Sequence, residues 1–225
     1  MEKTLLVGGV VSLTTVDYPG YLSVVIFLQG CMWRCCYCHN QHLQSVSPTE
    51  SLPWEDILNL LKTREGLVEA VVFSGGEPLQ QPALVDAIED VKKMKFKIGL
   101  HTSGAFPEKL AQVLPLIDWV GIDVKYEFER YPEITGVPSS GEAARKSLNL
   151  LIASGVEFEA RMTVYETMNA SSITNVLKEI AALGVKTVAL QKYRDEKENV
   201  VEHSIFSDKL LLTDISKCFE NFYIR

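Results

Sequence analysis

The residues with the clearest chemical potential are cysteines, and most of them lie in one short stretch of the chain. The 225 residues include five cysteines, and four of these fall between positions 31 and 38. Cys31, Cys35 and Cys38 follow the spacing Cys-x3-Cys-x2-Cys. Thiolates are the usual protein ligands of iron in iron–sulfur clusters. Three thiolates on one loop therefore predict a [4Fe–4S] cluster whose fourth iron is open to another ligand.

The same thiols leave alternatives open. A structural zinc site needs four ligands, and Cys35, Cys38 and His39 could contribute, but no second Cys-x2-Cys pair follows downstream. A redox pair of Cys35 and Cys38 would leave the first cysteine unused. Cys36 could replace its neighbour as a ligand, and we interpret it instead as a spectator or packing residue. We expect Cys218 to be a buried helix residue.

Short apolar, β-branched runs alternate with segments of helical periodicity along the chain. The expected strands span residues 23–28, 70–74, 97–102, 119–124, 158–164 and 187–190. The expected helices span residues 53–64, 82–94, 107–114, 142–154, 171–183 and 207–219. Six such units predict an α/β fold with a parallel sheet and right-handed crossovers. Periodicity alone allows either a doubly wound sheet or a partial barrel, and in both the ligand binds at the carboxyl ends of the strands.

Glycines and polar residues follow the expected strands at that end. Gly75 and Gly76 follow the second strand, where the missing side chains let the backbone approach a ligand closely. Thr102 and Ser103 end the third strand and Asp123 ends the fourth. Hydroxyl and carboxylate groups at strand ends suit ligand contacts, although tight or solvated turns would account for the same residues.

Composition limits the classes of function. The formal net charge is −7, which disfavours non-specific binding to nucleic acid or to anionic membranes. The start of the chain lacks the apolar region of a signal peptide, and no apolar run reaches the roughly 20 residues that span a bilayer. Clustered thiols suit a reducing compartment. We therefore expect a cytoplasmic protein that binds neither nucleic acid nor membrane.

The cysteine loop resembles that of a known superfamily. Residues 29–40 read Gln-Gly-Cys-x3-Cys-x-Tyr-Cys-His-Asn and look like the cluster loop of radical S-adenosylmethionine (SAM) enzymes. The resemblance implies a partial (βα)6 TIM-like barrel of parallel strands, with the three cysteines binding the cluster and Tyr37 near the SAM adenine. It also implies one radical SAM domain over residues 1–225, with the cluster loop at 30–40 and the six units at about 23–219.

The resemblance extends to the other strand ends. The Gly-Gly-Glu-Pro string at residues 75–78 is similar to the motif that binds the SAM amino group, which brings in Glu77. Residues 123–125 resemble the Asp-Leu-Lys string of glycyl-radical activating enzymes, in which the aspartate lies near SAM and helps to hold a monovalent cation. Lys125 thereby becomes a site residue. Arg161 is expected near the SAM carboxylate or ribose, although it could equally pair with a carboxylate.

A second motif narrows the resemblance to one group. The string Asp-Tyr-Pro-Gly at residues 17–20, together with the cluster loop, is similar to the activating proteins of anaerobic ribonucleoside-triphosphate reductase. The resemblance implies an oxidoreductase in which a reduced cluster donates one electron to SAM. The resulting 5′-deoxyadenosyl radical would abstract hydrogen from a glycine of the partner reductase. An electron donor such as flavodoxin or ferredoxin is also implied.

Two other functions fit the cysteines. One is a radical SAM enzyme that acts on a small molecule, such as a deazapurine or nucleotide precursor. The other is an iron–sulfur redox protein without catalysis, which would leave SAM intact after reduction.

Replacing single cysteines tests the ligand set. Cys31→Ala, Cys35→Ala and Cys38→Ala should each abolish the visible absorbance of a thiolate-ligated cluster after anaerobic reconstitution, because each removes one iron ligand. Cys36→Ala should retain that absorbance and serves as the matched control. Loss of the cluster in Cys36→Ala and its retention in Cys35→Ala would show that the ligand set is wrong.

Overall fold

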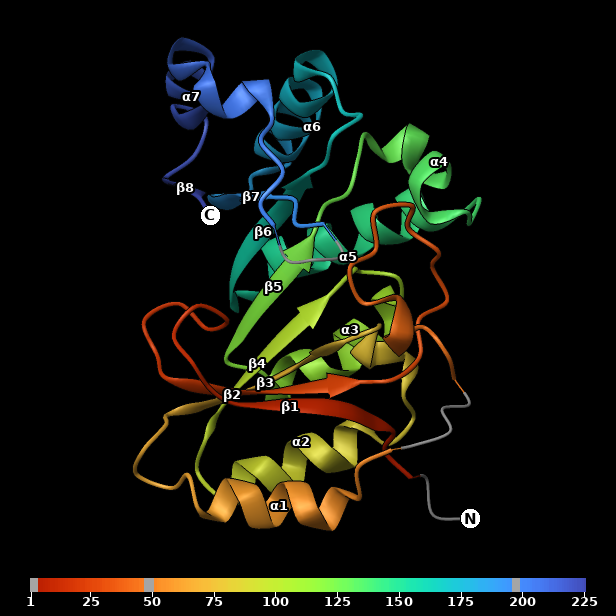
Figure 1. The fold of residues 1–225 in the computed structure, drawn as a ribbon, viewed down its shortest axis with the longest axis vertical. Coiled ribbons are helices and arrows are strands. Elements are labelled where there is room, and N and C mark those ends of the chain that lie inside the picture. Colours follow the sequence, from red (N-terminus) through yellow and green to blue (C-terminus); the bar gives the residue numbers. More distant parts are fainter. Residues whose placement is uncertain (1–3, 47–50, 196–198) are drawn as a thin grey trace.

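The computed structural model describes residues 4–46, 51–195 and 199–225, which form one eight-stranded sheet (Figure 1). The strands lie in the sheet in their order along the chain. β1 pairs antiparallel with β2, and all later neighbours pair in parallel. The strands are β1 (Val7–Thr14), β2 (Ser23–Leu28), β3 (Ala70–Gly75), β4 (Lys97–Thr102), β5 (Trp119–Asp123), β6 (Glu157–Val164), β7 (Thr187–Lys192) and β8 (Asn221–Ile224).

This strand order decides between the two architectures that the sequence left open. A doubly wound sheet reverses its strand order at a switch point, whereas here each parallel strand is added on the same side as the last. The fold is therefore the partial TIM-like barrel, and that prediction is confirmed. The single domain over residues 1–225 stays a prediction.

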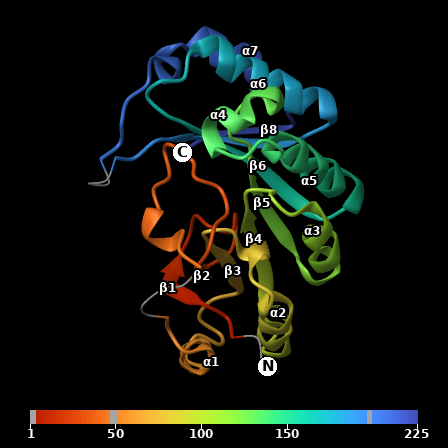
Figure 2. The same cartoon turned by 90° about the vertical axis from the view of Figure 1, so that its right-hand side faces the viewer.

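The helices lie outside the curved sheet (Figure 2). They are α1 (Trp54–Lys62), α2 (Leu84–Lys93), α3 (Pro107–Val113), α4 (Tyr131–Thr135), α5 (Ser140–Ser154), α6 (Ala170–Leu183) and α7 (Lys209–Ser216). Short 3-10 helices add η1 (Gln41–Leu43), η2 (Pro78–Gln80), η3 (Leu114–Leu116), η4 (Phe128–Arg130) and η5 (Ser204–Ser207). Among the helices of the described chain, none combines the length and the hydrophobicity that crossing a bilayer requires.

The six expected strands are all present, and their ends shift by at most two residues. Sequence reasoning missed β1, β8 and α4. β1 contains two glycines and is largely half-exposed, so it lacks the apolar run of a buried strand. β8 has four mostly exposed residues and α4 has only five residues, so neither is long enough to show a clear period.

The prediction of a buried Cys218 was wrong. α7 ends at Ser216, three residues before the expected end of the helix. Cys218 lies in the turn that follows α7, and its side chain is exposed.

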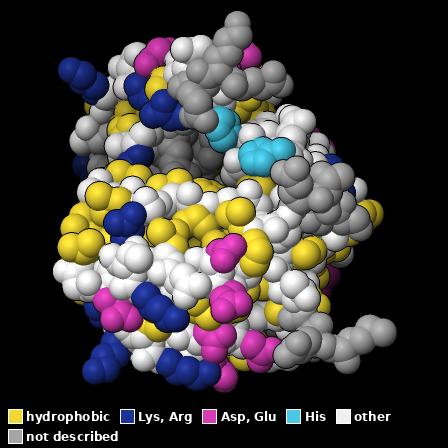
Figure 3. Space-filling view, turned by 60° about the horizontal axis from the view of Figure 1, so that its bottom comes forward, with side chains coloured by type: hydrophobic (Ala, Val, Ile, Leu, Met, Phe, Trp, Pro, Cys, Tyr) yellow, Lys and Arg dark blue, Asp and Glu magenta, His cyan; other side chains and the backbone are white. Residues whose placement is uncertain are grey.

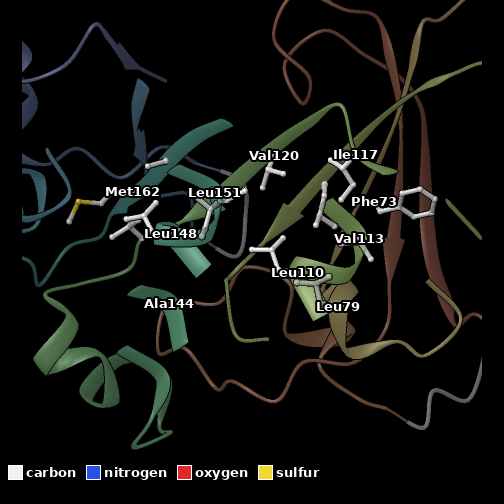
Figure 4. Packing of buried hydrophobic residues seen from close by; sticks show 14 of the residues in the cluster. Phe73, Leu79, Leu110, Val113, Ile117, Val120, Ala144, Leu148, Leu151 and Met162 are labelled. Carbon is white, nitrogen blue, oxygen red and sulfur yellow. The ribbon is translucent and has the colours of Figure 1, made fainter. Parts of the chain in front are cut away.

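Alternate residues of the buried strands serve two cores. Val71 and Phe73 of β3 belong to the large core between sheet and helices, part of which Figure 4 shows. Their neighbours Ala70 and Val72 belong to a smaller cluster. Successive side chains of a strand point to opposite faces of the sheet, so the smaller cluster fills the inside of the barrel.

Tyr18 anchors the segment after β1 within the smaller cluster. Its ring is buried, and its centroid lies 5.2 Å from that of Trp119, the first residue of β5. Gly99 of β4 leaves room for the ring, because a Cβ there would approach Tyr18 Cδ2 to 3.1 Å. The Asp-Tyr-Pro-Gly segment therefore packs inside the sheet.

Shortening Tyr18 should destabilise the fold. Tyr18→Ala should lower the free energy of unfolding by about 3–5 kcal/mol, because it removes a buried ring that the neighbouring residues cannot replace. Tyr18→Phe keeps the ring and should cost less than about 1 kcal/mol. Denaturant unfolding of both variants measures the difference, and equal losses would contradict the packing role of the ring.

Candidate functional site

A cavity of about 520 Å³ opens at the carboxyl ends of the strands. Figure 3 shows that one face of the molecule is hollowed, with hydrophobic side chains gathered along one side of the hollow. Most of the expected site residues line the cavity, namely Cys31, Cys35, Tyr37, Cys38, Gly75, Gly76, Thr102, Ser103, Asp123, Lys125 and Arg161. Residues from the cluster loop and from strand ends across the sheet are therefore brought to one site.

The cluster loop is held by backbone hydrogen bonds to the end of α4. The Arg34 amide donates to the Thr135 carbonyl oxygen at 2.9 Å, and the Cys36 amide donates to the Ile134 carbonyl oxygen at 3.2 Å. The three expected ligand cysteines are partly buried and line the cavity, whereas Cys36 is exposed and does not. This arrangement agrees with the interpretation of Cys36 as a spectator.

Burial makes two of the cavity thiols harder to deprotonate. It raises the pKa of Cys31 to about 11, and it also raises the pKa of Cys35, while nearby Lys125 opposes both shifts. Such thiols stay protonated at neutral pH unless a strong positive partner binds them, and iron is such a partner. Deprotonation of these thiols therefore depends on a metal partner, which an iron–sulfur cluster would supply.

The arrangement of the thiols also bears on the zinc alternative. Within residues 4–46, 51–195 and 199–225, no three His, Cys, Asp or Glu side chains converge on a position that could hold one metal ion. In a [4Fe–4S] cluster each thiolate binds a different iron, so three cluster ligands need not converge on one point. The geometry of the described residues gives the zinc alternative no support.

Tyr37 lines the cavity, and its ring also packs against other residues of the protein. Its ring stacks on that of Tyr165, with centroids 4.5 Å apart and planes 21° apart. Lys125 Nζ lies 5.8 Å from the Tyr37 centroid. The loop-packing role of Tyr37 is thus present, and its contact with adenine stays a prediction.

The turn after β3 is joined tightly to the end of β2. The Gly76 amide donates to the Leu28 carbonyl oxygen at 2.9 Å, and the Glu77 amide donates to the Gly30 carbonyl oxygen at 2.8 Å. A Cβ on Gly76 would lie 2.3 Å from the Gly30 oxygen, so only glycine fits there. Both amides are already hydrogen-bonded within the protein. A bound ammonium group is itself a donor, so carbonyl oxygens would have to accept from it.

Glu77 differs from the expectation that it faces SAM. Its side chain is 0% exposed and is not part of the cavity lining. The carboxylate accepts hydrogen bonds from the Leu79 amide at 3.1 Å, from Thr102 Oγ1 at 2.8 Å, and from both the amide and the hydroxyl of Ser103. Glu77 therefore positions the end of β4, and the two hydroxyls expected at SAM donate to it.

Arg161 lies deep in the cavity and is paired with protein groups. Its Nε donates to Glu159 Oε1 at 3.0 Å, and its Nη2 donates to the Asp17 carbonyl oxygen at 3.3 Å. Arg225 contacts the same Glu159 carboxylate through two hydrogen bonds of 2.8 Å. The alternative in which Arg161 pairs with a carboxylate is present, and a contact with SAM stays a prediction.

Several cavity residues were absent from the predicted site, among them Asp17, Ser74 and His101. Burial and the nearby Arg161 guanidinium hold the pKa of His101 well below its usual value, so its ring is neutral at pH 7. Its Nδ1 lies 3.3 Å from Ser74 Oγ. Asp17 opens the Asp-Tyr-Pro-Gly string and His101 lies within the expected strand 97–102, but the sequence does not show that both side chains point into the cavity.

Two further histidines and a glutamine divide between the cavity and the rest of the protein. His39 and Gln191 line the cavity. His203 does not line it, because its Nε2 lies 2.7 Å from the Met168 carbonyl oxygen and its Nδ1 accepts from the Ile205 amide.

Comparison with known proteins identifies the family to which the chain belongs. Residues 25–180 match the model of the radical SAM superfamily. A Methanocaldococcus jannaschii protein, provisionally named a glycyl-radical enzyme activating enzyme, is 34% identical over 183 residues, which cover 78% of this chain and 75% of that protein. The pyruvate formate-lyase-activating enzyme of Clostridium pasteurianum is 29% identical over 207 residues, covering 84% of each chain.

A solved structure shows the same fold at low sequence identity. SuiB of Streptococcus suis, in a crystal structure bound to S-adenosylmethionine, superposes with a TM-score of 0.67 at 14% identity. The match covers 88% of this chain and 48% of SuiB. This likeness shows the fold alone.

The chain therefore belongs to the radical SAM superfamily and, within it, to the glycyl-radical enzyme activating enzymes. It is a radical SAM enzyme, and the cofactors of its family are a [4Fe–4S] cluster and SAM. The resemblance inferred from the cysteine loop is confirmed.

The buried Glu77 carboxylate predicts a pH effect on stability. Burial raises its pKa, and the hydrogen bonds from Ser103, Thr102 and Leu79 offset this only in part. The folded state then holds the Glu77 proton more tightly than the unfolded state does. In the unfolded state glutamate has a pKa of about 4.3. The stability that Glu77 contributes should therefore fall as pH rises from about 4.3 through the raised pKa of the folded state.

Melting temperatures of the wild type and Glu77→Gln between pH 4.5 and 8 measure this effect. The wild type should lose stability relative to Glu77→Gln as pH rises. Glu133→Gln is the control, because Arg130 lowers the pKa of the exposed Glu133, so its difference from the wild type should change little over this pH range. A difference between wild type and Glu77→Gln that stays constant with pH would contradict the account.

Proposed function

We propose that the protein activates anaerobic ribonucleoside-triphosphate reductase by abstracting hydrogen from a glycine of that enzyme. The observation that carries the proposal is that three cysteines, a Gly-Gly turn and polar strand ends line the same cavity. The activating relatives support a glycyl-radical protein as the partner. The Asp-Tyr-Pro-Gly segment supports the reductase in particular, because it resembles that of the reductase-activating proteins.

The residues around the cavity have separable roles in this proposal. Cys31, Cys35 and Cys38 would hold the cluster. When bound, the cluster and SAM supply a one-electron cleavage of SAM and a radical that takes hydrogen from carbon. The chain itself binds, orients and shields these groups from water, as proteins do for reactive cofactors.

SAM would contact the strand ends beside the cluster loop. We assign it to the carbonyl groups of Gly75 and Gly76, to the polar groups of Asp123 and Lys125, and to the Tyr37 ring. Thr102 and Ser103 would line its site while they donate to Glu77. Arg161 would border the SAM site within the cavity.

The cluster needs an electron from outside the chain. We propose a small redox protein such as flavodoxin or ferredoxin as the donor. All five cysteines are free, and free thiols and an exposed cluster suit the reducing cytoplasm. We therefore assign the protein to the cytoplasm. We also propose that residues 1–225 form a single radical SAM domain.

Electron paramagnetic resonance tests the proposed partner. The reconstituted protein, SAM and reductant should be incubated anaerobically with the reductase from the same host. We expect a glycyl-radical doublet on the reductase, because the α-hydrogen of the target glycine is removed. The doublet should be absent when the target glycine is replaced by alanine.

Controls separate the chemistry from its target. Cys36→Ala should produce the doublet and Cys35→Ala should not. A doublet only on a different glycyl-radical protein would overturn the assignment of the reductase. Turnover of a deazapurine or nucleotide precursor without any partner protein would favour the small-molecule alternative and contradict the proposal.

A further inference from the structure

Asp123 and Lys125 form an ion pair at the edge of the cavity. Lys125 Nζ lies 3.0 Å from Asp123 Oδ2. The Lys125 side chain is 10% exposed, whereas the Asp123 side chain is 48% exposed. Both residues line the cavity. The carboxylate at this strand end therefore already has a cation, and that cation belongs to the chain.

The oxygens around Asp123 are poorly suited to a monovalent metal ion, which the resemblance to activating enzymes would place here. Such an ion needs several oxygen ligands to replace its water. The Asp123 carbonyl oxygen accepts from the Tyr131 hydroxyl at 3.4 Å. Thr102 Oγ1, on the neighbouring strand, donates to Glu77 and accepts from the Gly104 amide at 3.0 Å.

The charges nearby also disfavour a second cation. On the β6 side, the register partner of Asp123 is Arg161. Among the described residues that line the cavity, the one other carboxylate is that of Asp17, which accepts the Thr14 hydroxyl at 2.6 Å. With Lys125 and Arg161 beside Asp123, little net negative charge is left at this strand end for a metal ion.

Lys125 is held in a defined position. Its amide donates to the Tyr131 hydroxyl at 2.9 Å, and its ammonium lies over the Tyr37 ring. Burial by itself lowers the pKa of Lys125, but the Asp123 carboxylate more than offsets this, and the pKa stands well above its usual value. The ammonium is therefore charged at neutral pH and has N–H donors beyond the one used by Asp123.

We propose that Lys125 is the resident cation of the SAM site. Its ammonium neutralises Asp123 where a sodium or potassium ion would otherwise bind, and it offers its remaining donors to the SAM carboxylate. SAM binding then requires no monovalent metal ion. The proposal rests on the proposed function only in that SAM occupies this cavity, and it is independent of the partner protein.

Equilibrium binding of SAM tests this directly. The anaerobic holoprotein should be dialysed against labelled SAM in sodium, potassium or choline chloride at equal ionic strength. Choline carries the same charge but cannot bind as a small metal ion. The Kd of the wild type should vary by less than about twofold among the three salts, because the resident ammonium is present in each.

Variants of Lys125 complete the test. In Lys125→Met, the Kd in choline chloride should rise about tenfold or more, because the SAM carboxylate loses its ammonium partner and Asp123 is left without a neutralising cation. Sodium or potassium should recover part of that loss by entering the vacated position. Lys125→Arg keeps a cation and should stay insensitive to the choice of salt. Iron content and visible absorbance should be measured for each variant to confirm that the cluster is loaded.

Two results would overturn the proposal. One is a wild-type Kd that is about tenfold weaker in choline chloride than in the metal salts, because a metal ion would then be required. The other is a cluster-loaded Lys125→Met that binds SAM as the wild type does in all three salts. If Lys125→Met fails to hold its cluster, the wild type and Lys125→Arg still decide the question. Failure to transfer a radical to the reductase would affect none of these measurements.

Discussion

The carboxylate of Glu77 is buried where the ends of β2, β3 and β4 meet, and the geometry of the cavity depends on it. A buried carboxylate is costly unless donors surround it. Here the donors come from η2 and from the end of β4, while the Glu77 amide bonds the Gly30 carbonyl oxygen beside the cluster loop. Through its side chain and its amide, this one residue joins three segments that border the cavity. These hydrogen bonds join groups of the protein alone and do not require a bound cofactor.

A second support acts on the cluster loop from the opposite side. Trp33 is buried and meets the ring of Tyr131 edge to face, with centroids 5.9 Å apart. The Tyr131 hydroxyl accepts the Lys125 amide, so α4 links the loop to the end of β5. Together with the Arg34 and Cys36 amides, these contacts set which thiols line the cavity. The short helix that sequence periodicity could not reveal is therefore central to the site.

The sequence was informative wherever one local signal dominated. Apolar β-branched runs located the strands of the barrel, because strands buried on both faces have few polar residues. The spacing of Cys31, Cys35 and Cys38 located the cluster loop, since three ligands close together need no knowledge of the fold. β1 was missed because its burial depends on pairing with β2 rather than on its own apolar residues.

Side-chain direction was the information that the sequence lacked. Glu77 follows β3 and Thr102 is the last residue of β4, yet Glu77 is enclosed in protein and Thr102 lines the cavity. Asp17 reaches the cavity because Tyr18 is anchored inside the sheet, which involves residues some 80 to 100 positions away. Contacts of that range depend on the curvature of the partial barrel, and no local pattern encodes them.

The central claim is that this cavity binds SAM at a cluster able to cleave it. The most direct measurement is chromatographic: the cluster-loaded protein is reduced anaerobically with dithionite, SAM is added, and the products are quantified. The account predicts 5′-deoxyadenosine and methionine in equal amounts, with none formed when the reductant is omitted. Intact SAM after reduction of a fully loaded cluster would contradict it.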